Sequence, residues 1–158
     1  MTNELKQEYT LRISQANKTQ LIVILYDITL TYLKDALTFF EQGKTDEYKY
    51  QLQLAKKCIE EMIKNLHFEY ALAADLKQIY LSMKKALREA ELESRDEPVK
   101  AVMTNIETLK AAYEEIAAND TSEPVMGHTQ TVVAGLTYGK NSLSEDLSGE
   151  SSNRGFRV

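Results

Sequence analysis

The sequence of 158 residues is poor in the residues on which several common kinds of site depend. It has one cysteine, Cys58, which excludes an intrachain disulfide framework and fits a reducing compartment. Neither of its two histidines, His67 and His128, follows a Glu at the three-residue spacing of di-iron helical bundles. Because zinc spacings, Gly-rich phosphate loops and nucleophile elbows are also missing, we expect no metal, no cofactor and no enzymatic activity.

Long apolar runs and clustered positive charge are missing as well. The longest apolar run is the six residues Leu21 to Tyr26, which is too short to cross a bilayer. Residues 1–17 contain no apolar segment of the kind found in secretory signals, so we expect a cytoplasmic protein without membrane insertion. A net charge of −5, with lysines spread along the predicted helical faces, argues against a nucleic-acid partner.

Glycine is scarce until the last quarter of the chain, and this sets the predicted domain organisation. Five of the six glycines lie beyond residue 118. We therefore divide the chain into an N-terminal arm (1–17), a helical domain (18–118) and a largely disordered tail (119–158). Within the tail, one apolar island stands out, formed by Val132, Val133, Leu136 and Tyr138.

The first predicted helix begins near Lys18 and runs to about Gln42. Asn17 and Gln20 have the spacing of a capping box, and Gly43 supplies the expected end of the helix. The residues of this helix form one apolar arc with a second arc beside it, covering roughly two-thirds of the circumference. Only a narrow strip is polar: Gln20, Asp27, Thr31, Lys34, Asp35 and Thr38.

Three further helices follow, each with a single apolar stripe. We expect the second to start with Thr45 as its cap, and a break near residues 67–70 because the apolar stripe changes phase there. The last helix begins near Pro98, a residue typical of a first turn. Four helices of about 20 residues with short links predict an all-α fold, an antiparallel four-helix bundle.

The wide apolar arc of the first helix leaves two interpretations open. The arm or the tail of the same chain could cover it as core, or it could be a groove for another protein. The residues on this arc and in the arm that we select for partner binding are Tyr9, Ile13, Ile22, Tyr26, Leu33 and Leu37.

An ordered set of short segments resembles the flagellar secretion chaperones of the FliS family. The set covers residues 9–117 and includes Ile13 to Ala16, Leu25 to Asp27, Leu66 to Glu69, and Asp75 to Tyr80. The resemblance implies a cytoplasmic helical bundle that binds the C-terminal segment of flagellin, prevents premature polymerisation and delivers the subunit to the flagellar export gate. It also implies that the arm, with Tyr9 and Ile13, shields the binding surface when no client is bound.

Two further expectations concern partners. The tail island could act as a tethered pseudo-ligand that occupies the groove until the client displaces it. A chaperone of this kind should be a monomer alone and form a 1:1 complex with its client. The alternative is a non-enzymatic adaptor that dimerises through the first helix and recruits another partner through its tail.

Overall fold

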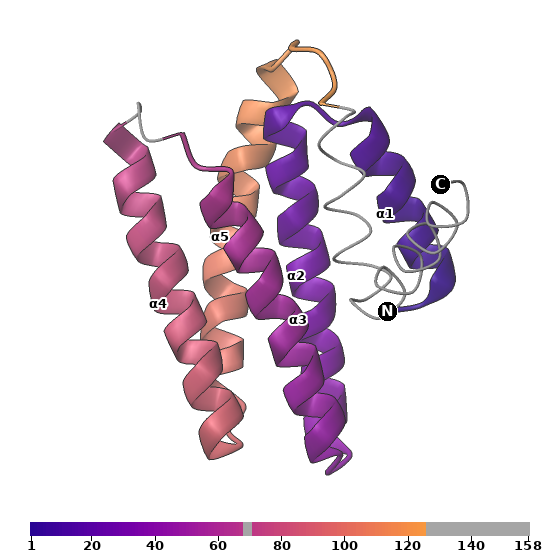
Figure 1. The fold of residues 1–158 in the computed structure, drawn as a ribbon, viewed down its shortest axis with the longest axis vertical. Coiled ribbons are helices and arrows are strands. Elements are labelled where there is room, and N and C mark those ends of the chain that lie inside the picture. Colours follow the sequence, from indigo (N-terminus) through magenta and orange to yellow (C-terminus); the bar gives the residue numbers. More distant parts are fainter. Residues whose placement is uncertain (68–70, 126–158) are drawn as a thin grey trace, which may run out of the picture.

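The computed structural model describes residues 1–67 and 71–125, and these residues form five α-helices and no strand. The helices are α1 (Asn3–Gln15), α2 (Lys18–Glu41), α3 (Thr45–Lys64), α4 (Ala71–Glu93) and α5 (Glu97–Asn119). Helices α2 and α4 each pack against both α3 and α5, while α1 lies outside this group alongside α2 (Figure 1). The prediction of an all-α fold is confirmed.

The helix boundaries follow from local sequence signals. At the start of α2 the Asn17 side chain accepts from the Gln20 N–H, and the Gln20 side chain accepts from the Asn17 N–H, so the predicted capping box is confirmed. Gly43, with a φ of +70°, follows α2 in the left-handed conformation that glycine adopts without strain. Helix α3 differs from the prediction, because Thr45 is its first helical residue and the cap position is Lys44, which makes no side-chain capping bond.

The predicted break between the second and third helices of the sequence analysis is confirmed. Helix α3 ends at Lys64 and α4 begins at Ala71, so the phase change marks two separate helices. Residues 68–70 lie outside the described residues. Pro98 lies in the first turn of α5, as its missing N–H and fixed φ favour.

Helix α2 is the centre of the molecule, because α1, α3 and α5 all pack against it. Leu25, Ile28 and Leu33 are fully buried, and the buried side chains of α2 belong to one cluster with those of the other helices. Three neighbouring helices of the same chain therefore account for an apolar arc that is wider than a surface helix needs.

The N-terminal arm takes a form that the sequence analysis did not predict. Residues 3–15 are the helix α1, capped by the Thr2 side chain, which accepts from the Leu5 N–H. Tyr9 and Ile13 are its two buried residues. A short, weakly patterned segment gives little helix signal of its own, so contacts with α2 decide its conformation.

A pair of buried tyrosines joins α2 to α4. The Tyr26 and Tyr80 hydroxyl oxygens are 2.5 Å apart, and both side chains are fully buried. The Tyr113 ring meets the Tyr26 ring edge-on, with 5.7 Å between centroids. Burial raises the pKa of Tyr26 and raises that of Tyr80 to about 12, so both hydroxyls stay protonated, and one donates to the other.

The Tyr80→Phe substitution should lower the free energy of unfolding by about 1–3 kcal/mol, because it leaves the buried Tyr26 hydroxyl without its hydrogen-bond partner. The double variant Tyr26→Phe with Tyr80→Phe should recover most of this loss, since no polar group is then left unpaired. Urea unfolding of the three chains measures both values. A double variant that loses as much as the sum of the two single variants would contradict this account.

Cys58 is fully buried. Desolvation raises the pKa of its thiol to about 12, so the thiolate required for nucleophilic or metal chemistry is suppressed.

Candidate functional site

Helix α1 lies on the narrow polar strip of α2. The N-terminal ammonium of Met1 pairs with Asp35 at 2.5 Å, and the Tyr9 hydroxyl lies 3.0 Å from the Thr31 Oγ1. Asp35 and Thr31 are both residues of the strip that the helical wheel identified. The polar strip is therefore the surface on which α1 docks.

Two apolar side chains anchor α1 between these polar contacts. Ile13 is fully buried and Tyr9 is 5% exposed, whereas Leu11, on the other side of the same helix, is 59% exposed. Burying a side chain of this size stabilises by about 1.5–3 kcal/mol, and part of that is spent on ordering the segment. Helix α1 is held by a few contacts of moderate strength, and it packs against α2 alone among the helices.

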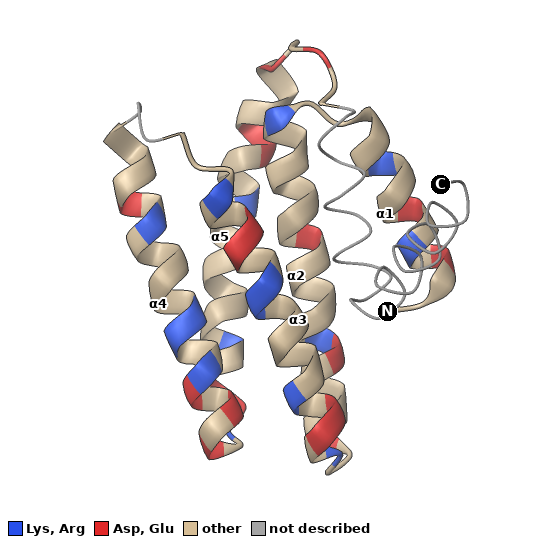
Figure 2. Ribbon diagram, viewed as in Figure 1, with Lys and Arg blue, Asp and Glu red and all other residues tan. Residues whose placement is uncertain are grey.

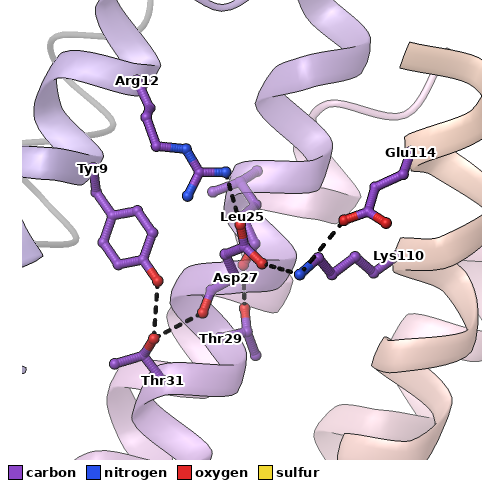
Figure 3. A network of polar contacts seen from close by, with 8 residues as sticks. All are labelled: Tyr9, Arg12, Leu25, Asp27, Thr29, Thr31, Lys110 and Glu114. Carbon is purple, nitrogen blue, oxygen red and sulfur yellow. Dashed lines mark hydrogen bonds and ion pairs between the residues drawn. The ribbon is translucent and has the colours of Figure 1, made fainter. Parts of the chain in front are cut away.

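Asp27 is the centre of the polar network between α1, α2 and α5 (Figure 3). Its Oδ2 accepts from the Arg12 Nη2 at 2.7 Å, and its Oδ1 lies 2.5 Å from the Lys110 Nζ. The hydrogen bond to Asp27 raises the pKa of Lys110, and Lys110 also lies 3.5 Å from Glu114. If α1 undocked, Arg12 would leave Asp27, but Lys110 would still form an ion pair with it. Undocking of α1 therefore leaves the Asp27 carboxylate with a partner.

The six residues predicted for partner binding fall into three groups. Tyr9 and Ile13 are on α1 and cover α2. Ile22 and Leu37 are half-buried at the margin of the core. Tyr26 and Leu33 are fully buried between the helices, so neither presents a surface to a partner in this conformation.

Sequence reasoning missed the polar residues that join α1 to α2. From the sequence we selected Tyr9 and Ile13 for partner binding and gave no role to Arg12, Asp27 or Thr31. The polar strip itself could have indicated these residues. Its width on a central helix matches the width of one short helix packed against it.

The first residues after α5 are folded back onto the junction between α1 and α2. The Asn17 side-chain amide donates to the Asp120 carbonyl at 3.2 Å, and the Thr19 hydroxyl donates to the Asp120 carboxylate. The Val125 N–H donates to the Ala16 carbonyl at 2.9 Å. Residues 120–125, which we call the strap, thus differ from the predicted disorder of the tail.

The Asp120 carboxylate accepts hydrogen bonds from protein groups within this turn. The Ser122 hydroxyl and N–H both donate to its Oδ1, at 2.6 and 2.9 Å. The hydrogen bond from the Ser122 hydroxyl, followed by those from the Thr19 hydroxyl and the Ser122 N–H, lowers the pKa of Asp120 to about 2. The Asp120 carboxylate is therefore ionised at neutral pH and can accept all of these hydrogen bonds.

A hollow, which we call the junction hollow, lies beside the strap and between α1, α2 and α5. Its apolar lining comes from Ala16, Val23, Ile24 and Ala117, and Arg12 and Glu114 are among its polar residues. Ala16 both lines this hollow and accepts the last described hydrogen bond of the strap. Val125, the last described residue, therefore lies beside the junction hollow.

The remaining predicted residues are outside this surface. Val132, Val133, Leu136 and Tyr138 of the tail island, and His128, lie outside the described residues. His67 is exposed after the end of α3. Among the described residues no three metal-ligating side chains gather, and no helix is both long and apolar enough to span a membrane.

Positive charge is less scattered than the sequence suggested. A second hollow between α3 and α4 is lined by Lys56, Lys57, Lys84, Lys85 and Arg88, and the Lys84 Nζ lies 2.8 Å from the Glu60 Oε1. Figure 2 shows the Lys and Arg positions, in blue, along both α3 and α4. Lys56 pairs with Glu91 at the same place. This basic face lies away from α1 and has no part in the site under α1.

A family model described as flagellar protein FliS matches residues 1–120, which include α1 and all four helices packed behind it. No curated protein matches the chain. The family implies a flagellar export chaperone with flagellin as its client. On this match, which covers 120 of the 158 residues, the chain belongs to the FliS family of flagellar proteins.

Proposed function

We propose that this chain is a cytoplasmic, non-enzymatic export chaperone that binds the disordered C-terminal segment of flagellin on the face of α2 that α1 covers. Helices α2 to α5 act in this proposal as an antiparallel four-helix bundle and form the rigid body of the chaperone. Helix α1 acts as its removable cover. Binding keeps the terminal segment of flagellin from polymerising before export.

The observation that carries the proposal is that α1, of the five helices in the described residues, packs against α2 alone. A helix of 13 residues is marginally stable alone, so we infer that α1 can leave without disrupting the helices behind it. The Tyr26–Tyr80 pair and the ion pair of Asp27 with Lys110 do not depend on it. A client helix can therefore replace α1 at a cost limited to the few contacts that α1 makes.

The chemistry of the covered face fits an amphipathic helical client. Beneath α1 the strip offers Asp27, Thr31 and Asp35 as hydrogen-bond acceptors or ion-pair partners. The sites of Tyr9 and Ile13 accept apolar side chains one helical turn apart, the pattern of helix-in-groove recognition. Ile22 and Leu37 extend the apolar margin of this face.

Dimerisation through α2, the alternative from the sequence, is disfavoured by burial. The apolar arc that would have formed a dimer interface already packs against α1, α3 and α5. We therefore expect the chain to be a monomer that binds one client.

Light scattering tests this expectation. The protein alone should have a mass near 18.0 kDa that does not change with concentration, and saturating C-terminal flagellin peptide should add one peptide mass. A mass that doubles with concentration and does not change with peptide would support the adaptor and overturn the chaperone proposal.

A further inference from the structure

We propose that the apolar tail segment Val132–Tyr138 occupies the junction hollow and thereby holds α1 on α2. This inference rests on the proposed function for its biological meaning, because α1 covers the proposed client face. The physical contact itself can be tested without any client.

The strap fixes where the tail begins. Its contacts from Asn17, Thr19 and Ala16 hold residues 120–125 against the α1–α2 junction. Asn17 is itself buried and caps α2, so the strap is attached to a rigid point of the fold. Six residues separate Val125 from Val132, and an extended chain of that length reaches about 20 Å. This tether is long enough for the island to reach the junction hollow.

The composition of the tail selects this segment as the occupant. Val132–Tyr138 contains five apolar residues and no charge, which suits the apolar lining formed by Val23, Ile24 and Ala117. The apolar residues farther along the tail adjoin charged ones: Leu143 and Leu147 flank Glu145 and Asp146, and Phe156 lies between Arg154 and Arg157. Those residues would bring charges into the hollow at a desolvation cost.

The occupant would act through α1. The junction hollow is lined on one side by Arg12 and Ala16, at the end of α1, and on the other by α2 and α5. A side chain placed there touches α1 and its support at once, so it favours the docked position. Tethering supplies an effective concentration in the millimolar range, which makes even a segment of about 100 μM affinity roughly tenfold more bound than free.

Hydrogen exchange of the full chain without client tests the contact. The variant carrying Val133→Asp and Leu136→Asp should increase the exchange rates of the α1 amides about tenfold, with those of α3 and α4 unchanged. The matched control carries Leu143→Asp and Leu147→Asp, which place the same charges elsewhere in the tail, and should exchange like the unmodified chain. Equal α1 exchange in all three chains would overturn the proposal, as would an equal increase in both variants.

Calorimetric titration with the C-terminal flagellin peptide separates this inference from the proposed function. If both hold, the Val133→Asp, Leu136→Asp chain binds the peptide more tightly than the control by a similar factor. If none of the chains binds the peptide while α1 exchange still rises in that variant, the tail contact stands and the client assignment fails. If all bind with equal affinity and exchange is unchanged, the chaperone stands and the tail contact fails.

Discussion

The Ile13→Asp variant is expected to bind the C-terminal flagellin peptide at least tenfold more tightly than the unmodified chain. Ile13 is fully buried between α1 and α2, and a carboxylate there loses the apolar contact and is desolvated without a partner. The docked position of α1 then becomes the minor state. When a cover is docked in about 99% of molecules, its release raises the apparent affinity by up to about 100-fold. Calorimetric titration measures the change.

Leu11→Asp is the matched control for this variant. Leu11 lies two residues away on the same helix and is 59% exposed, so the same change of side chain leaves α1 docked. It should bind the peptide like the unmodified chain. Weaker binding by Ile13→Asp than by Leu11→Asp, with both chains folded by circular dichroism, would mean that docked α1 is part of the client site.

The Leu33→Ala variant is expected to lose about 2–5 kcal/mol of unfolding free energy while keeping its affinity for the peptide at temperatures where it remains folded. Leu33 is fully buried in the cluster shared by the helices, so its truncation leaves a cavity in the core and leaves the client face intact. Urea unfolding gives the first value and calorimetry the second. This expectation revises the sequence-based choice of Leu33 as a contact residue.

Leu37→Ala provides the comparison on the same helix, one turn further along. Leu37 is only partly buried against the core, so the loss of stability should be the smaller of the two. If Leu33→Ala weakens peptide binding more than Leu37→Ala without destabilising the fold, then Leu33 is exposed during binding and α2 itself must rearrange.

Much of the helical architecture could be predicted because local rules decide it. The Asn17–Gln20 capping box, the glycine at position 43 and the proline at position 98 each act through their own backbone, whatever the distant surroundings. The boundary between α3 and α4 has neither glycine nor proline. The change in phase of the apolar stripe located it, because the apolar residues of one continuous helix stay on the same face.

The candidate site could be predicted less well because its contacts join segments far apart in the sequence. Tyr9 and Ile13 were identified as anchors, but their helical conformation depends on docking against α2. Asp27 looked like an ordinary polar residue of a helix surface, and only the fold brings Arg12 and Lys110 to it. Tyr26 and Leu33 were chosen as groove residues because a helical wheel shows which face is apolar without showing which part other helices cover.

The same limit applies to the strap. Asp120 and Ser122 are residue types that are common in loops. Nothing in the neighbouring sequence indicates that this loop returns to Asn17 and Thr19. Contacts across about one hundred residues of sequence are set by the packing of α5 against α2.

In the proposed mechanism, α1 covers the surface to which the client binds. Hydrogen exchange of the full chain, measured with and without saturating C-terminal flagellin peptide, tests it most directly. We expect bound peptide to slow the exchange of the α2 amides and to speed the exchange of the α1 amides, because the peptide takes the place of α1. Peptide that binds while α1 stays as protected as before would contradict the claim and place the client on another face of the molecule.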